Sequence, residues 1–147
     1  MSISSERTAV KPLLQVLATP LAVCKLPATS PLPSWLNLEL VISEELLVIV
    51  RTTDELSLVC AENSVPKAIQ AARGWRAIKV SGPLDFSLVG ILAGIAAPLA
   101  EAGISIFAVS TFDTDYVLVR AGDVSRAVAT LKEAGYTFVS EDLQRRS

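Results

Sequence analysis

The chain has 147 residues, a formal net charge of −2, and 51% hydrophobic against 19% charged residues. This balance is typical of a globular protein with a sizeable core and excludes a disordered chain. Lysine and arginine form no cluster beyond Arg145-Arg146 near the end, so no basic surface is available for a phosphate backbone, and we expect no nucleic-acid partner.

Residue types that catalyse hydrolysis or hold metals are scarce. The chain has no histidine, which removes the commonest zinc ligand and the usual general base of serine and cysteine hydrolases. Cys24 and Cys60 lie in separate apolar runs, where thiols commonly act as small buried hydrophobic groups; a disulfide between them is the alternative. No nucleophile elbow or phosphate loop is present. We therefore expect a protein that is not an enzyme and binds neither a metal nor a cofactor.

The first half of the chain is mainly strand-like. Residues 1–12 are predicted to be a flexible N-terminus, and a smaller, mainly β module is predicted over residues 13–73. Its strands are expected at four apolar runs, residues 13–17, 21–26, 46–51 and 56–60. The last two runs flank Thr52-Thr-Asp-Glu55 and indicate a hairpin, which could add a second site or be only a turn; we favour the turn. A helix is expected at residues 65–72.

The second half, residues 74–141, shows a βαββαβ order, which is the ferredoxin-like form of an α+β fold. Strands are expected at residues 75–81, 104–110, 115–120 and 136–140, and helices at residues 87–102 and 124–134. Asp85 or Ser87 is the expected N-cap of the first helix, and Gly103 is its expected C′ residue. Residues 142–147 are expected to be a tail.

The most apolar stretch is too short to cross a membrane. Residues 86–100 carry no charge, but a span needs about 20 apolar residues. Pro98 and then Glu101 interrupt the run. Without a targeting signal at its start, the protein is expected in the cytoplasm and away from membranes.

A polar loop between two apolar strands is the best candidate for a binding site. Residues 110–115 join the strands at 104–109 and 116–119, and ligands are often held by loops on a rigid scaffold. Asp113 and Asp115 could anchor a cation, or aspartate and threonine could simply close the turn through backbone bonds. Residues 82–85 could turn backbone N–H groups toward a carboxylate, or form only a turn with an N-cap.

The strand before this loop is predicted to lie at an open edge. A ferredoxin-like sheet ordered 4-1-3-2 leaves its second strand, residues 104–110, with one free side. Both faces of this strand are largely apolar, because Phe107 and Val109 alternate with Ile106 and Ala108. An exposed apolar edge invites pairing, so we expect it to meet a second copy of the chain.

Residues 75–120 resemble ACT domains, ferredoxin-like modules that bind amino acids and similar ligands between paired copies. The resemblance is to the ACT modules of CASTOR-type arginine sensors in particular. The matching residues are Pro98-Leu-Ala100, Ile104-Ser-Ile106, Ser110-Thr-Phe112 and Asp115. The first half adds a weaker similarity to a truncated ACT-like fold. The chain thus resembles one half of such a tandem sensor, with an ACT domain preceded by a smaller ACT-like module.

The resemblance implies a homodimer whose C-terminal ACT domains pair side by side around an amino acid or related small metabolite. Asp115 would hold a cationic group, backbone amides would hold a carboxylate, and Phe112 would exclude water. The alternative is a protein–protein pairing module without a small-molecule ligand. Ser105 and Ile106 of one subunit would face Thr111, Phe112 and Asp115 of the other. The implied ligand-binding residues are Asp85, Phe86, Ser105, Ile106, Thr111, Phe112 and Asp115.

Overall fold

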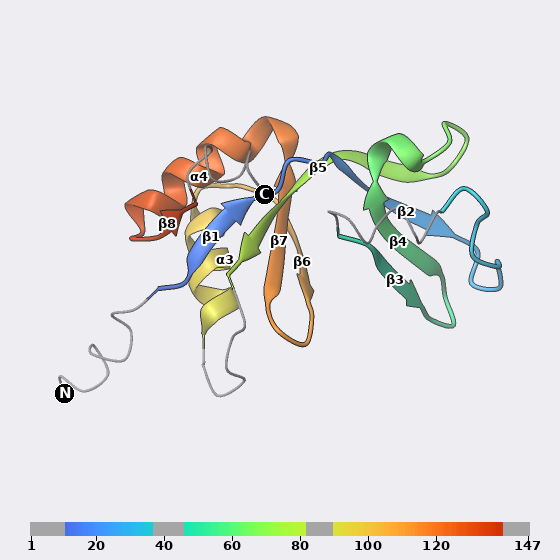
Figure 1. Cartoon of the computed structure of the whole chain (residues 1–147), viewed down its shortest axis with the longest axis horizontal. Helices are drawn as coiled ribbons and strands as arrows, with labels where there is room; N and C mark the ends of the chain where they lie inside the picture. The colour runs from blue at the N-terminus through green and yellow to red at the C-terminus, as the bar shows by residue number, and fades with distance from the viewer. Residues whose placement is uncertain (1–10, 37–45, 82–89, 140–147) are drawn as a thin grey trace. The chain divides into compact units, whose positions relative to one another are not determined.

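The computed structural model describes residues 11–36, 46–81 and 90–139, which fold as two compact units (Figure 1). One unit contains residues 1–16 and 77–147, and we call it the C-terminal unit. The other contains residues 17–76 and is called the inserted unit, because it interrupts the first along the chain. The boundaries therefore differ from the expected division into residues 13–73 and 74–141, since the first strand joins the C-terminal unit.

The inserted unit has one sheet with the strand order β3-β4-β2-β5. Its strands are β2 (Leu21–Leu26), β3 (Val48–Arg51), β4 (Leu56–Ala61) and the first part of β5 (Ala71–Val80). Neighbouring strands are antiparallel. This is the ferredoxin-like order with β3 as its second strand at the edge. The expected hairpin is confirmed, but the helix expected at residues 65–72 is wrong: the short 3-10 helix η1 (Glu62–Ser64) and an irregular segment lead directly into β5.

Connecting segments cover the core of the inserted unit. Most inward side chains of β2 and β4 are fully buried, Leu56 and Leu58 among them. Leu36 and Val65 lie over them from outside the strands. Arg51 ties one of these segments down by donating hydrogen bonds to the carbonyl oxygens of Ala28 and Ser30. Side-chain-to-backbone bonds thus fix segments that lack the regular bonding of a helix.

The C-terminal unit has the strand order β6-β7-β5-β1-β8, and its described residues include two α-helices. Its further elements are β1 (Leu13–Val16), α3 (Ile91–Glu101), β6 (Ile106–Ser110), β7 (Asp115–Arg120), α4 (Val124–Glu133) and β8 (Thr137–Phe138). From β5 onward the order along the chain is βαββαβ, so the ferredoxin-like α+β fold is confirmed. No helix among the described residues is long and apolar enough to span a membrane.

The strand β1 separates the first and fourth strands of this motif. It pairs antiparallel with β5 and parallel with β8, so the expected direct contact of strands 4 and 1 is wrong. The physical reason is burial, because Leu14 is fully buried in the core of this unit with Ile78 and Val80 of β5. Residues 13–16 therefore belong to the second module and not to the first.

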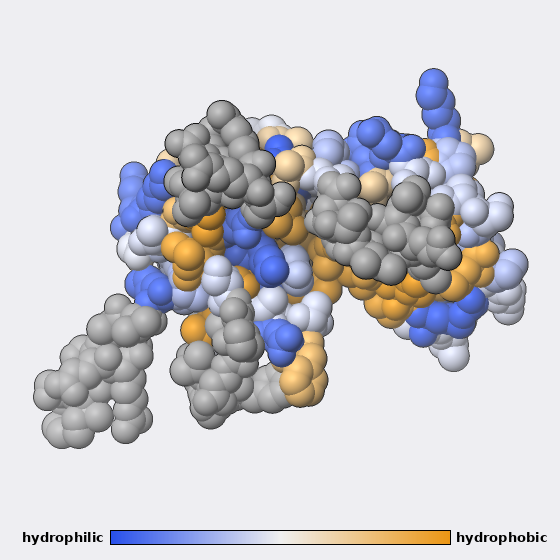
Figure 2. All heavy atoms as spheres, viewed as in Figure 1, coloured by the Kyte–Doolittle hydropathy of each residue, from blue (hydrophilic) through white to orange (hydrophobic). Residues whose placement is uncertain are grey.

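The two helices cover one face of this sheet. Ile95 and Leu99 of α3 and Leu131 of α4 are fully buried against inward residues of the strands. The helix α3 begins after Gly90, which has a left-handed backbone with φ of 83°. The expected N-caps Asp85 and Ser87 are therefore wrong, and both lie outside the described residues. In the inserted unit, Figure 2 shows hydrophobic residues gathered at the surface around β3 and β4.

Both helices end in the same way. Each carries the sequence Glu-Ala-Gly at its end, with Gly103 at φ of 74° and Gly135 at φ of 100°. The amide of the residue after each glycine donates to a carbonyl in the last turn, Ile104 to Leu99 and Tyr136 to Leu131. This is the Schellman pattern, with its apolar contact between the same residues. The expected helix ends at these glycines are confirmed.

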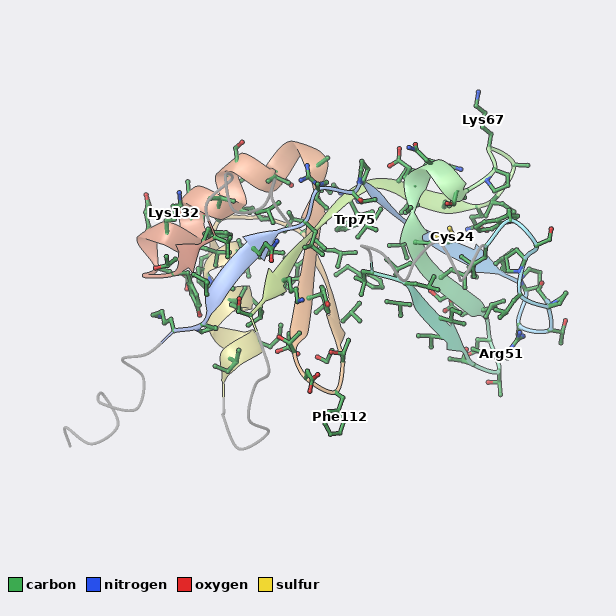
Figure 3. All side chains as sticks on the ribbon, in the orientation of Figure 1. Cys24, Arg51, Lys67, Trp75, Phe112 and Lys132 are labelled. Atoms are coloured by element: carbon green, nitrogen blue, oxygen red, sulfur yellow. The ribbon has the colours of Figure 1, made fainter. Side chains whose placement is uncertain are left out.

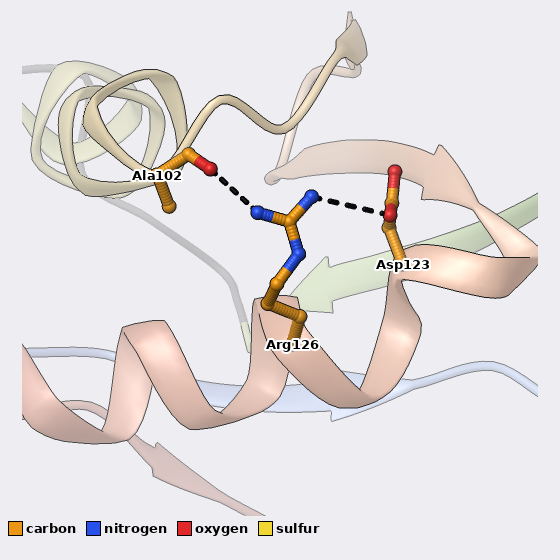
Figure 4. A network of polar contacts seen from close by, with 3 residues as sticks. All are labelled: Ala102, Asp123 and Arg126. Carbon is orange, nitrogen blue, oxygen red and sulfur yellow. Dashed lines mark hydrogen bonds and ion pairs between the residues drawn. The ribbon is translucent and has the colours of Figure 1, made fainter.

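Arg126 connects the end of one helix to the start of the other (Figure 4). Its guanidinium donates to the carbonyl oxygen of Ala102 at 2.6 Å and to Asp123 Oδ1 at 3.3 Å. A cation at the carboxyl end of α3 also compensates the partial negative charge of that helix end. This contact fixes α4 relative to α3 within the unit.

We expect Leu14→Ala to lower the free energy of unfolding by about 2–5 kcal/mol, because a fully buried leucine is lost from the core. Leu13→Ala is the matched control: its side chain is 42% exposed, so the change should stay within about 0.5–1 kcal/mol. Urea denaturation measures both. Equal effects would contradict the placement of β1 in this core.

Gly94 has no room for a side chain. A Cβ atom there would lie 2.8 Å from the hydroxyl oxygen of Tyr136, although alanine favours a helix by about 1 kcal/mol over glycine. We expect Gly94→Ala to destabilise the native chain and to stabilise the Tyr136→Phe variant, with a coupling energy of about 1 kcal/mol or more in urea denaturation. An equal gain in both backgrounds would rule out the steric explanation.

Candidate functional site

The polar loop lies at the tip of the β6–β7 hairpin. Five residue pairs join the two strands, from Ile106 opposite Val119 to Ser110 opposite Asp115. Among the described residues β6 pairs with β7 alone, so the predicted open edge is confirmed for this part of the chain. The loop that follows Ser110 therefore lies at one corner of the sheet.

Two threonines close the loop through backbone bonds. The amide and hydroxyl of Thr111 both donate to the carbonyl oxygen of Thr114, at 2.8 and 3.1 Å. The same hydroxyl oxygen accepts from the Thr114 amide at 3.2 Å. Thr114 is 7% exposed and its hydroxyl donates to the carbonyl oxygen of Val80. The turn-closing interpretation of this loop is thus correct for its threonines.

Ser110 and Asp115 form the polar pair beside the turn. The Ser110 hydroxyl donates to Asp115 Oδ1 at 2.6 Å, a short distance typical of a carboxylate acceptor. Asp115 alternates with Val117 and Val119 along β7, both of which are fully buried in the core, so it lies on the face that the helices cover. Because serine has one proton to donate, this pair can offer only acceptors to a ligand, namely the remaining lone pairs of Ser110 Oγ and Asp115.

The other polar and aromatic residues of the loop point elsewhere. Asp113 lies within the turn and not on β7, so it does not belong to the strand face on which Asp115 lies. Phe112 is 80% exposed at the tip of the hairpin (Figure 3). Among the described residues, no three Cys, Asp or Glu side chains come together as metal ligands would.

The remaining predicted site residues lie apart from the loop. Ile106 is the first residue of β6 and Ser105 precedes it, and four residue steps of about 3.4 Å separate Ile106 from Ser110. Within one chain the structure does not bring them together with Thr111, Phe112 and Asp115. Asp85 and Phe86 fall outside the described residues.

A second hairpin in the inserted unit has the same turn. Thr52 donates through its amide to the Glu55 carbonyl oxygen at 2.9 Å, and its hydroxyl accepts from the Glu55 amide at 3.1 Å. Arg51 stands opposite Leu56, at the place that Ser110 and Asp115 hold in the other hairpin. Leu56, which is fully buried, thus takes the position of Asp115. Because this hairpin lacks a carboxylate there, the interpretation as a turn only is favoured.

Ser110 and Thr114 lie in the predicted loop, but they were not among the predicted ligand-binding residues. Their roles depend on register, because only the pairing of Ser110 with Asp115 brings the hydroxyl to the carboxylate. The signal was present in the sequence as a repeated spacing, since each hairpin has a threonine, an aspartate two residues later and one more residue before the returning strand.

Two family models match the chain, one in each half. The model of the ACT domain family matches residues 70–133, and a model of an N-terminal domain matches residues 20–68. The cytosolic arginine sensor for mTORC1 subunit 1 of Rattus norvegicus is 36% identical over 69 residues, which is 46% of this chain and 21% of the sensor. The chain thus spans about a fifth of the length of this curated relative.

Solved structures extend the similarity over most of the chain. A protein of Agobacterium tumefaciens is 34% identical with a TM-score of 0.80, over 89% of this chain and 94% of that one. The regulatory subunit of aspartate kinase from Thermus thermophilus is 9% identical with a TM-score of 0.56, over 82% and 94% of the two chains. The second likeness concerns the fold alone.

We expect Thr114→Val to cost about 1–3 kcal/mol of stability, because the buried carbonyl of Val80 loses its hydroxyl donor. Thr53→Val in the equivalent loop is the control, since that exposed residue should change stability by less than about 0.5 kcal/mol. Thermal or urea unfolding compares them. A negligible loss for Thr114→Val would show that this bond does not hold the loop to β5.

Proposed function

Because residues 70–133 match the ACT domain family model, we propose that the chain is a non-catalytic regulatory protein. It would bind an amino acid or a related small metabolite between the C-terminal ACT domains of a homodimer. The observation that carries the proposal is the open edge of β6, which pairs with β7 alone among the described residues. Half-buried Phe107 and Val109 make this edge apolar, and such edges favour pairing with another strand.

The register of an antiparallel pair supports this arrangement. If two copies of β6 meet about a twofold axis at Ala108, Ile106 of one copy stands opposite Ser110 of the other. Ser105 then lies beside Thr111 of the partner subunit. Site residues that are at opposite ends of one strand thereby become neighbours across the pair, with about 5 Å between opposed Cα atoms.

The surface of α3 is compatible with a close approach of a second copy. Ala93, Ala97 and Ala100 are exposed in the single chain, and none of them carries a side chain longer than a methyl group. Within one chain this small-residue surface is exposed. Pairing through the neighbouring edge strand would provide the cover that burial of apolar surface favours.

The polar groups at the hairpin favour a ligand rich in hydrogen-bond donors. The Ser110 proton is already given to Asp115 and the Thr111 proton to Thr114, so an ammonium or guanidinium group would find acceptors there. A ligand carboxylate would have to be held elsewhere, by backbone amides of residues 105–106 or by Asp85 and Phe86, which lie outside the described residues. The curated relative is named as an arginine sensor, so arginine is the first ligand to test.

A pairing module without a small ligand is the second candidate. It is favoured by Phe112, an aromatic side chain that is 80% exposed, and by loop hydroxyls that are already bonded within the chain. The two functions differ in whether any amino acid stabilises the dimer.

Pairing through β6 predicts that Ala108→Lys breaks the dimer. Two lysines would meet at the twofold axis, and their repulsion should raise the dimer dissociation constant at least about tenfold. Val50→Lys is the control, because Val50 is 46% exposed on β3, the edge strand of the inserted unit. Light scattering after size exclusion gives the mass of each protein. A dimer that persists in Ala108→Lys, or a native chain that is monomeric, would contradict pairing through β6.

Amino-acid binding predicts a higher melting temperature with arginine or another cationic amino acid. Ligand at about 100 times its dissociation constant should add about 2.7 kcal/mol to the free energy of unfolding. Asp115→Asn should abolish this shift, whereas Asp113→Asn should keep it, because Asp113 lies in the turn away from Ser110. A dimer that no amino acid stabilises would support the pairing module instead.

A further inference from the structure

The inserted unit contains two thiols on one face of its sheet. Cys24 on β2 and Cys60 on β4 are 1% and 2% exposed, and Figure 3 labels Cys24 within this sheet. In the register Cys24 stands opposite Leu58 and Cys60 opposite Ala22. The cysteines are therefore diagonal neighbours on the inward face, and both are free thiols.

The surroundings make the two thiols unequal. A hydrogen bond from Cys60 lowers the pKa of Cys24, the positive charge of Arg73 lowers it further, and burial opposes both effects. The same hydrogen bond and burial raise the pKa of Cys60. Arg73 is held beside this core by donating to the carbonyl oxygens of Val65 and Pro66. Cys24 is thus suited to attack an oxidant as a thiolate, and Cys60 to remain protonated.

We propose that Cys24 and Cys60 are an oxidation site that converts reversibly between a dithiol and a disulfide when the folded protein meets hydrogen peroxide. The Cys24 sulfur attacks one peroxide oxygen, the O–O bond breaks, and the departing hydroxide takes a proton to become water. Cys60 sulfur then attacks the sulfenic sulfur of Cys24, the S–O bond breaks, and the second hydroxide leaves as water with the proton of Cys60. Two thiols lose two electrons and one peroxide becomes two waters.

The strand geometry favours a disulfide that is easily reduced. Diagonal neighbours have Cα atoms about 7–8 Å apart, whereas a relaxed disulfide needs about 4.4–6.8 Å. The strands must therefore move together, and β2 has a register irregularity against β5 between Leu21 and Val23, next to Cys24. A bond formed under such strain has a higher reduction potential than a structural disulfide, which makes it reversible.

The cover over the thiols gives a small oxidant a way in. Leu36 and Val65, with the partly buried Trp35 and Ile69, pack over the same core from segments outside the strands. Segments without regular secondary structure open at lower free energy than helices and strands do. Peroxide is close to water in size, so brief local opening is enough for it to reach Cys24.

The experiment treats the folded native chain with hydrogen peroxide and measures the intact mass without reductant. We expect loss of the mass of two hydrogen atoms, which dithiothreitol restores. In Cys60→Ser the Cys24 sulfenic acid should accumulate and react with dimedone. In Cys24→Ser the remaining thiol should label at least about tenfold more slowly, because it lacks the hydrogen bond that activates its partner. Circular dichroism before and after treatment verifies that the reaction occurs in the folded state.

Two outcomes would overturn the proposal. Thiols that stay unchanged in the folded native chain would make the pair a purely structural part of the core. Equal dimedone labelling of the two serine variants, with both folded, would show that the surroundings do not distinguish Cys24 from Cys60. Oxidation that joins two chains, visible as a doubled mass, would also contradict a bond within one inserted unit.

Discussion

The strand β1 is the constraint on which the C-terminal unit depends. It lies between β5 and β8, and among the described residues β8 has no other strand neighbour. Leu14 is fully buried where these strands meet the helices. The free energy gained by burying this apolar side chain therefore holds the two ends of the unit together across an insertion of sixty residues, residues 17–76.

The two units are variants of one topology. Each has its second strand at the edge and a hairpin closed by a threonine, Thr52 in one and Thr111 in the other. The two hairpins differ in the residue that begins the returning strand. Leu56 enters the core of the inserted unit, whereas Asp115 keeps a carboxylate beside Ser110. The pair beside the turn is thus what separates the two hairpins: Arg51 and Leu56 in one, Ser110 and Asp115 in the other.

The units also differ in what covers the sheet. Helices α3 and α4 cover the C-terminal unit and are joined through Arg126, which bonds to both helix ends. In the inserted unit connecting segments cover the core instead. Arg51 and Arg73 hold these segments by donating hydrogen bonds to their carbonyl oxygens. Backbone bonds within a helix protect a core more firmly than such ties do. The buried thiols of the inserted unit therefore lie under a cover that opens more readily than the helices of the C-terminal unit.

Local patterns in the sequence were sufficient for several elements. Glycines at 103 and 135 end both helices as expected, because only a left-handed residue allows the Schellman bonds. The hairpins were predicted from alternating apolar runs around polar turns. Asp85 was a plausible N-cap by residue type, but α3 begins at Ile91, after Gly90 with its left-handed backbone.

The sequence by itself determined the α+β class, the βαββαβ order of the second half and the open edge at β6, because these follow from local periodicity and turn chemistry. Only the tertiary structure decided that residues 13–16 join the second module, that Ser110 meets Asp115 and that Cys24 lies diagonal to Cys60. Each of these depends on which strands pair and in which register. Pairing is set by the burial of side chains far apart along the chain, which no local pattern records.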